Sequence, residues 1–410
     1  MNLFIDEAAN IEFSYDDLLA QLNNKKELNK YIYSTNIKEV IIDFISSLYY
    51  GYDVILLDGD FTFKELDNLK VAQEDLTYKN IIEAHNNISN IDELIEKILE
   101  KSNDIKVSIF TSGTTGMPKK FEHSLAALLR NIKISEKHKN DIWGFAYNIT
   151  HFAGIQVFLQ AFVNKNTIVN LFNKNSNNAD VLLRKYKCNS ISATPTFYRN
   201  FIFISNEKNL NLKFVTFGGE KFDNDLLLKA KNKFPNAKIR NIYASTEVGS
   251  LLSGINDSFI IPPNLKKVIK ISENNHLMIH RSLLQEKNVN DEWYDTNDIV
   301  SINKNGTFKI LSRESDFINV GGYKVNPLEV ESLILKVQGV LDVCITAREN
   351  SVIGNILVAN IRKDKNYSED ELKKSILKIL KNELQYFKIP RLFKFVDKIE
   401  RNRTGKKVRI

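Results

Sequence analysis

The stretch FTSGTTGMPKK, residues 110–120, decides the fold prediction. The apolar run Val107–Phe110 leads into it and predicts a buried strand. Gly113 and Gly116 let the backbone turn so that N–H groups can approach an anion, and Lys119 adds a positive charge. Further donors come from the hydroxyl groups of Thr111, Ser112, Thr114 and Thr115. The stretch therefore favours a phosphate-binding loop, although an ordinary surface loop can have the same composition.

Outward from this loop, short apolar runs alternate with amphipathic segments between Lys106 and Tyr243. NSISATPT, LKFVTFGGE and AKIRNIYAS are such runs, and a helical pattern from Asp223 to Phe234 separates the last two. This alternation is typical of parallel strands joined by helices. Between Leu265 and Ile310 the runs become short and are separated by Asn and Gly turns, which predicts a small antiparallel, barrel-like sheet.

The last hundred residues predict a separate small domain. We expect a helix at Glu329–Val337 and strands at LDVCITA and NILVANIR. Ser368 and Glu371 form a capping box, and apolar residues follow at helical spacing as far as Pro390. The predicted fold class is therefore α/β: a large N-terminal layered α/β domain over residues 1–312 with the small antiparallel sheet, plus a small C-terminal α+β domain over residues 316–410.

Composition narrows the function classes. The chain has 410 residues, of which 43% are hydrophobic, so it can bury a large core. Its net charge of +7 is scattered along the sequence, which argues against a nucleic-acid interface and suits a mild attraction for small anions. Cys188 and Cys344 fit no disulfide or metal spacing, which favours the cytoplasm. Without a signal-like start or an apolar run of ~18 residues, we expect no membrane span.

The motifs together resemble the adenylate-forming superfamily of acyl-CoA synthetases, peptide-synthetase adenylation domains and luciferases. TSGTTGMPK is similar to its signature, and further motifs follow in the family's order. They are NITHFAGIQ (148–156), ATPTFYRNF (193–201), FGGE (217–220), YASTE (243–247), YDTND (294–298), SRESDFINVGGYKVNPLEVE (312–331) and NRTGKKVRI (402–410). The resemblance runs from about residue 105 to the end. Fewer residues precede the loop than the family usually carries, so we expect a shortened N-terminal subdomain.

The resemblance implies an enzyme that uses ATP and Mg²⁺ to convert a carboxylic acid to its acyl adenylate and then forms a thioester. The acceptor would be coenzyme A, making it an acid–thiol ligase, or the phosphopantetheine of a carrier protein. The implied ATP-binding residues are Thr111, Ser112, Gly113, Thr114, Thr115, Gly116, Lys119, Gly218, Gly219, Glu220, Tyr243, Asp298 and Arg313.

Within that set the resemblance implies specific roles. Tyr243 stacks on adenine and Asp298 accepts from both ribose hydroxyls, while Arg313 contacts ribose or phosphate. The implied catalytic residues are Lys406, Thr246 and Glu247. Lys406 steadies charge between the α-phosphate and the attacking carboxylate, Thr246 bonds the α-phosphate, and Glu247 binds Mg²⁺. Lys407 is the competing candidate for the lysine.

The acyl and thiol sites follow from the same resemblance. His151, Phe152 and Phe197 would line the acyl pocket, with His151 shifting as the thiol arm enters; a buried, hydrogen-bonded histidine is the alternative. No aspartate lies between Tyr147 and Gln160 to bind an α-ammonium group, so a non-amino acid is favoured. The resemblance places the thiol-acceptor turn at Gly321 and Gly322 and the hinge at Ser315. It implies that the small C-terminal domain is mobile about that hinge.

Two further points remain open in the sequence. Asn297 stands where the family usually has glycine, and asparagine tolerates the left-handed backbone that such a turn needs. A degenerate nucleotide-binding regulator that no longer catalyses is the competing class of function. Retention of Lys406, Glu247 and Asp298 argues against it, because a non-catalytic descendant has no need of them.

Overall fold

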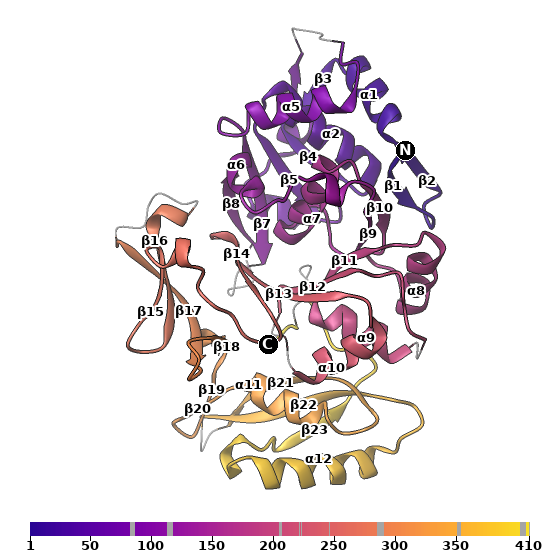
Figure 1. Cartoon of the computed structure of the whole chain (residues 1–410). Helices are drawn as coiled ribbons and strands as arrows, with labels where there is room; N and C mark the ends of the chain where they lie inside the picture. The colour runs from indigo at the N-terminus through magenta and orange to yellow at the C-terminus, as the bar shows by residue number, and fades with distance from the viewer. Residues whose placement is uncertain are drawn as a thin grey trace. The chain divides into compact units, whose positions relative to one another are not determined.

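The computed structural model describes residues 1–82, 87–112, 118–204, 207–220, 222, 224–245, 247–284, 291–350, 354–401 and 407–409. The chain divides into two compact units (Figure 1). The first contains Met1–Phe222, Leu226–Asn256 and Leu283–Asn290, and the second contains Asp223–Asp225, Asp257–Ser282 and Asp291–Ile410. Within the described residues, every helix is too short or too polar to traverse a lipid bilayer.

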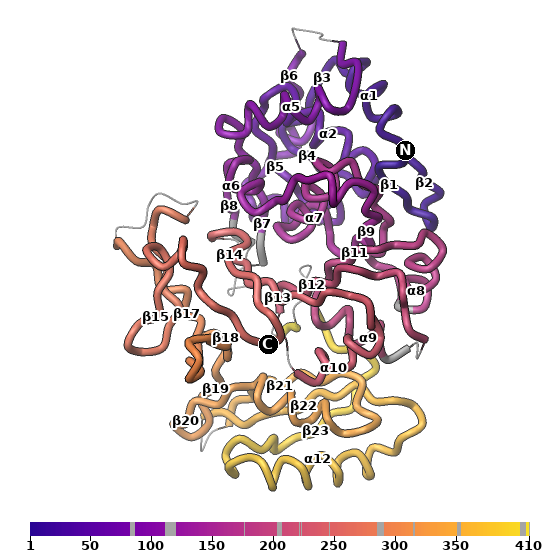
Figure 2. Tube along the Cα trace, in the orientation of Figure 1, coloured from indigo at the N-terminus to yellow at the C-terminus, as the bar shows by residue number. Residues whose placement is uncertain are grey.

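The larger sheet of the first unit is mainly parallel. Its strand order is β14-β13-β12-β11-β9-β10-β1-β2, and only the edge strands β14 and β2 run antiparallel to their neighbours. The bounds are β1 Asn2–Asp6, β2 Ile11–Ser14, β9 Ile142–Phe145, β10 Thr167–Asn170, β11 Ser190–Ala193, β12 Phe214–Gly218, β13 Lys238–Ser245 and β14 Gly249–Gly254. Phe4 of β1 pairs with Ile168 of β10, so the N-terminal strand extends the sheet (Figure 2).

The second sheet of this unit has the order β4-β5-β7-β8. Strands β4 (Tyr31–Ser34), β5 (Val54–Asp58) and β7 (Lys106–Ser112) are parallel, and β8 (Pro118–Ser124) returns antiparallel to β7. A short pair, β3 (Glu27–Asn29) with β6 (Lys79–Ile81), lies apart from it in the sheet topology. Five motif-bearing segments therefore follow or form the carboxyl ends of parallel strands, namely β7, β9, β11, β12 and β13, where ligands bind in open α/β sheets.

Helices between the sheets share one hydrophobic core with strands of both. Helix α2 (Ile37–Tyr50) starts at Asn36, whose side chain accepts from Lys38 N, and ends at Gly51, whose φ of 83° favours glycine. Phe44 of α2 packs 6.1 Å from Phe158 of α7 (Phe152–Val163) between ring centroids. The other helices are α1 Tyr15–Asn24, α3 Phe63–Asn68, α4 Gln73–Thr77, α5 Ile91–Glu100, α6 Leu125–Leu129, α8 Ser176–Lys185, α9 Pro195–Ile204 and α10 Asn224–Lys233.

The second unit holds the predicted antiparallel sheet and the predicted C-terminal α+β layer. The former has the order β15-β16-β17-β18, with bounds Ile269–Ile271, His276–His280, Trp293–Ile302 and Phe308–Arg313. The latter combines β21 (Val340–Asn350), β22 (Gly354–Lys363), β23 (Leu392–Phe395), helix α11 (Pro327–Ile334) and helix α12 (Glu369–Glu383). The hairpin β19 (Ile318–Val320) and β20 (Tyr323–Val325) precedes them. The predicted fold class is confirmed.

The N-terminal caps explain where the two helices of this smaller layer begin. The Ser368 side chain accepts from Glu371 N at the start of α12, as the capping box predicts, and Leu372, Ile376 and Leu380 are buried. Pro327 opens α11 at a position where its missing N–H costs nothing. The 3₁₀ turns are η1 Glu136–His138, η2 Pro263–Leu265, η3 Arg281–Leu283, η4 Glu314–Asp316 and η5 Tyr386–Lys388.

Candidate active site

The predicted phosphate loop joins the two strands of a hairpin. In the register of β7 and β8, Ser112 faces Pro118 and Thr111 faces Lys119. Gly113, Thr114, Thr115 and Gly116 lie outside the described residues, and the side chains of Thr111, Ser112 and Lys119 are not described either. The structure thus places both ends of the loop at the carboxyl end of β7, while its phosphate contacts remain predictions.

His123 links this hairpin to two other predicted segments. Its side chain is 1% exposed, and its ring lies 5.4 Å from the ring of Phe152, the first residue of α7. A side-chain carbon on Gly249, at the start of β14, would lie 3.4 Å from the same phenyl ring. Burial lowers the pKa of His123 to about 4, although the charge of Glu247 raises it. The hairpin, helix α7 and the end of YASTE therefore meet around a neutral imidazole.

Glu247 is the predicted magnesium ligand. The residue is half-buried, and no group of three or more potential ligands occurs among the described residues. Mg²⁺ keeps several waters and takes one or two carboxylates together with substrate phosphates, and the role of Glu247 as its ligand stays a prediction. Thr246, predicted to bind the α-phosphate, lies outside the described residues.

The FGGE segment follows β12 and is tied to helix α9. Gly219 has a φ of 83°, and Glu220 Oε2 accepts from Thr196 N at 3.0 Å and from Thr196 Oγ1 at 2.6 Å. The Glu220 carboxylate therefore holds the first turn of α9 against the strand end. A side-chain carbon on Gly218 would lie 3.6 Å from the Tyr147 hydroxyl, and burial raises the pKa of that phenol. Gly218 thus faces the segment that precedes α7, where the acyl pocket is predicted.

Tyr243, predicted to stack on adenine, lies in β13 opposite Leu252 of β14 and is half-buried. It occurs three residues before the undescribed Thr246, at the carboxyl end of the strand. Its strand position agrees with the edge at which the other segments of this unit gather, and its contact with adenine stays a prediction.

His151 is held by a carboxylate that the sequence did not indicate. It caps α7, and its Nε2 lies 2.9 Å from Oδ2 of Asp58 at the end of β5. Asn148 Nδ2 donates to Oδ1 of the same carboxylate at 2.9 Å, and Thr150 Oγ1 also donates to Oδ1. A side-chain carbon on Gly154 would lie 1.9 Å from Asn148 O, so only glycine lets this loop lie on the first turn of α7.

The two predicted pocket phenylalanines occupy different apolar clusters. Phe152 packs against the core shared by the two sheets, and Phe197 packs beside Phe201 at 5.9 Å in the cluster of α8, α9 and α10. His151 is a partly buried, hydrogen-bonded histidine in this conformation, with 13% of its side chain exposed. Whether Phe152 and Phe197 line one pocket stays a prediction.

In the second unit, the predicted ribose residues are adjacent. Asp298 of β17 and Arg313 of β18 are paired in register, and Arg313 Nε donates to Asp298 Oδ1 at 3.2 Å. Asp298 is 4% exposed. Asn297 has a φ of 56°, so asparagine does adopt the left-handed backbone expected of it. The structure thus presents a carboxylate and a guanidinium together, a pair able to bind a diol.

The thiol-acceptor and hinge positions also have defined backbones. Gly321 and Gly322 form the turn between β19 and β20 with φ values of 58° and 87°, and Asn319 Oδ1 accepts from Gly322 N at 3.0 Å. Space beside Gly322 is open, since a side-chain carbon there would meet nothing within 4 Å. Ser315 lies within the turn η4, and its side chain is not described.

Lys406 lies outside the described residues, but its rival Lys407 does not. Lys407 Nζ lies 3.2 Å from Glu331 Oε2 and 3.1 Å from Asp342 Oδ1, and its side chain is 10% exposed. An ammonium group held by two buried carboxylates is poorly placed to reach a substrate. These contacts favour Lys406 as the predicted catalytic lysine.

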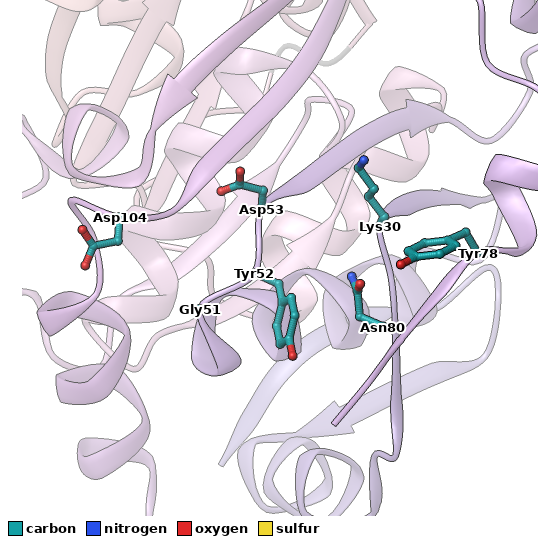
Figure 3. Close-up of a pocket in the computed structure, with 7 residues that line it drawn as sticks. All are labelled: Lys30, Gly51, Tyr52, Asp53, Tyr78, Asn80 and Asp104. Carbon is teal, nitrogen blue, oxygen red and sulfur yellow. The ribbon is translucent and has the colours of Figure 1, made fainter. Parts of the chain in front are cut away.

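A surface hollow of about 480 Å³ in the first unit is unrelated to these segments (Figure 3). Lys30, Asp53 and Asp104 line it, and these residues precede β4, β5 and β7. The hollow therefore lies at the amino ends of the parallel strands, whereas the predicted motifs follow their carboxyl ends. We do not assign it to the active site.

Comparison with protein families decides the identity of this arrangement. Residues 39–270 match the model of the AMP-binding enzyme family, and residues 329–406 match that of the AMP-binding enzyme C-terminal domain. The chain belongs to the AMP-binding enzyme family. Its segments around the carboxyl ends of β7, β9, β12 and β13 are thus those of an adenylate-forming enzyme.

Several members of the AMP-binding enzyme family are similar in sequence. The chain is 24% identical to 2-succinylbenzoate–CoA ligase of Listeria monocytogenes over 73% of its length and 67% of the relative. It is 25% identical to 4-hydroxybutyrate–CoA ligase 1 of Metallosphaera sedula, covering 75% of this chain and 61% of the relative. Bacitracin synthase 3 of Bacillus licheniformis is 23% identical over 74% of this chain, which spans 5% of that protein.

Solved structures of the AMP-binding enzyme family share the fold. The o-succinylbenzoate CoA synthetase of Bacillus subtilis with its acyl-adenylate intermediate has a TM-score of 0.72, 18% identity and coverage of 100% of this chain and 94% of that chain. The same synthetase with ATP and magnesium ion has a TM-score of 0.71, 19% identity and coverage of 100% and 95%. The fold is therefore shared over nearly the whole of both chains.

Proposed function

We propose that this chain activates a carboxylic acid as its acyl adenylate, at the expense of ATP, and transfers the acyl group to coenzyme A. It is an AMP-forming acid–thiol ligase that uses ATP and Mg²⁺. The supporting observation is the meeting of the phosphate-loop hairpin, the α7 loop and the Glu247 segment at the carboxyl edge of the first unit. In this family those three segments serve phosphate, acyl group and metal.

In the first half-reaction a carboxylate oxygen attacks the α-phosphorus and pyrophosphate leaves. The loop at 111–119 holds the leaving phosphates, Thr246 bonds the α-phosphate, and Lys406 neutralises the charge that grows there. Bound Mg²⁺ would supply further neutralisation of the phosphates, with Glu247 holding it. Tyr243 and the pair Asp298 and Arg313 bind the nucleoside.

In the second half-reaction a thiol attacks the acyl carbon and AMP leaves. We propose that residues 1–312 and 316–410 act as two bodies that reorient about Ser315 between the half-reactions. The open turn at Gly321 and Gly322 lets the thiol arm approach closely, because neither residue carries a side chain.

The acid is a small carboxylic acid without an α-ammonium group. Among the residues near the α7 loop, Asp58 is the nearest carboxylate, and its oxygens already bind Asn148, Thr150 and His151. Its oxygens are therefore engaged, and among the described residues no other carboxylate is seen to contact this loop. The free cysteines Cys188 and Cys344 are both buried, which suits the reducing cytoplasm that we propose as its location.

A carrier protein is the second candidate acceptor, favoured by the match to bacitracin synthase 3. We expect coenzyme A to be the acceptor of the acyl group, because this chain is similar over most of its length to two CoA ligases. The test is a panel of acids that includes 2-succinylbenzoate, 4-hydroxybutyrate, benzoate and octanoate, each scored for pyrophosphate release with and without coenzyme A. At least one acid should support release and yield AMP and an acyl-CoA; ADP as the nucleotide product would contradict the proposal.

A further inference from the structure

One buried carboxylate organises the loop that precedes α7. Asp58 is 5% exposed and accepts from Asn148, Thr150 and His151, which are side chains of a single four-residue segment. Oδ1 accepts hydrogen bonds from the Asn148 amide and the Thr150 hydroxyl, and Oδ2 is the partner of the His151 imidazole. Asp58 therefore fixes both the loop and the ring of His151.

This pair lies where the two sheets of the first unit present their carboxyl ends. Asp58 is the last residue of β5, and the loop at 146–151 follows β9 (Figure 1). Phe152, the next residue after His151, touches His123 and the start of β14 beyond Glu247. The imidazole thus belongs to the same edge as the proposed reacting groups.

The hydrogen bond also fixes which nitrogen can accept a proton. An ionised carboxylate only accepts, so Nε2 of His151 carries the hydrogen and Nδ1 of the neutral ring keeps its lone pair. Within the part of the chain that the structure describes, Nδ1 makes no hydrogen bond, and 13% of the side chain is exposed. The ring is therefore oriented through Nε2, while Nδ1 has no hydrogen-bond partner among the described residues.

The other described histidines of this unit lack this combination. His123 is 1% exposed and has no carboxylate within hydrogen-bond distance in the described residues. His138 has a carboxylate partner, Asp141 at 3.0 Å, but Asp141 precedes β9 and so lies at the opposite, amino edge of the sheet. His151 alone among these combines a carboxylate partner with a position at the reacting edge.

We propose that His151 accepts the proton of the attacking thiol in the second half-reaction and that Asp58 is its positioning residue. This role rests on the proposed function. The thiol proton passes to Nδ1 while sulfur bonds the acyl carbon. The bond from that carbon to the phosphate oxygen breaks, and AMP leaves with the electron pair. His151 then returns the proton to water, which leaves the pair ready for another cycle.

The test compares two acceptors in the full-length enzyme with the acid that gives most product in the panel above. Hydroxylamine traps the acyl adenylate as a hydroxamate without a thiol proton, whereas coenzyme A requires loss of that proton. We expect H151A at pH 7 to lose about 30-fold more of its thioester rate than of its hydroxamate rate. D58N should show the same split with a loss of about tenfold.

A pH series separates proton transfer from a structural role. A thiol such as that of cysteine ionises near pH 8.5, so at pH 9 it no longer needs a base. The thioester defect of H151A should therefore shrink at least about tenfold between pH 7 and pH 9. The double variant D58N/H151A should be no slower than H151A, because Asp58 acts through the imidazole.

The matched control is D141N, which alters the other buried aspartate with a histidine and an asparagine partner. D141N should not lower the thioester rate more than the hydroxamate rate. An unchanged thioester rate in H151A, equal losses with both acceptors, or a defect that persists at pH 9 would each overturn the proposal. If wild type makes no hydroxamate with any acid, the proposed function itself fails instead.

Discussion

Replacing Lys406 with alanine is expected to lower acid-dependent exchange of pyrophosphate into ATP by about 100- to 1,000-fold. The lysine supplies a point charge where negative charge develops between carboxylate and α-phosphate, so its loss raises the barrier of the first half-reaction. Binding of ATP, measured by equilibrium titration, should change little because the phosphate loop and Glu247 remain. Exchange equal to that of wild type would contradict the assigned role.

The neighbouring Lys407 provides the comparison. Its ammonium group is held by Glu331 and Asp342, so K407A should act mainly on stability. We expect K407A to lower the midpoint of thermal unfolding while, below that temperature, it retains more exchange activity than K406A. The reverse order of activities would show that the catalytic lysine is Lys407.

Replacing Glu331 with glutamine is expected to reduce the unfolding free energy of the second unit by about 3–5 kcal/mol. Glu331 is 3% exposed and accepts from Ile345 N, while Lys407 and Arg409 pair with its carboxylate. The neutral variant leaves these cations partly uncompensated in a buried setting. Urea unfolding followed by circular dichroism measures the change, and the exposed Glu383→Gln is the control.

The same cluster predicts how stability depends on pH. Burial would raise the pKa of Glu331, but the charges of Lys407 and Arg409 outweigh it and hold the pKa below its usual range. The pKa of Asp342 is likewise lowered, against burial, by Lys407 and Arg401. A lowered carboxyl pKa adds stability that is complete above the unfolded value of about 4 and is lost as pH falls through the folded value.

Wild-type unfolding midpoints should therefore fall steeply below about pH 4, whereas E331Q should show a shallower acid limb because one titrating group is gone. Parallel slopes for the two proteins, measured by thermal unfolding between pH 3 and pH 7, would show that the cluster does not carry this dependence.

Local chemistry made much of the fold predictable. The α12 capping box lies within four residues of sequence, and the structure has Ser368 accepting from Glu371 N as the pattern indicates. Asn297 adopts the left-handed backbone because its own side chain tolerates it. Some motifs also located strand ends: the phosphate-loop motif follows β7, and FGGE overlaps the end of β12.

Contacts between distant segments could not be predicted in this way. Asp58 and His151 are 93 residues apart, and no local pattern marks Asp58, which follows an apolar run as a turn residue would. Glu331 and Lys407 are 76 residues apart, so the sequence left Lys407 as a rival for catalysis. Only the fold shows that the Asp58 carboxylate orients the imidazole of His151 and that the Glu331 carboxylate holds Lys407.

Detection of the acyl adenylate is the most direct test of the proposed first half-reaction. Enzyme, ATP labelled at the α-phosphate, Mg²⁺ and the panel acids are mixed without thiol, quenched in acid and separated by chromatography with mass detection. We predict a labelled acyl-AMP that accumulates on the enzyme and is converted to AMP and acyl-CoA when coenzyme A is added. Label appearing in ADP, or an acyl phosphate in place of acyl-AMP, would contradict it.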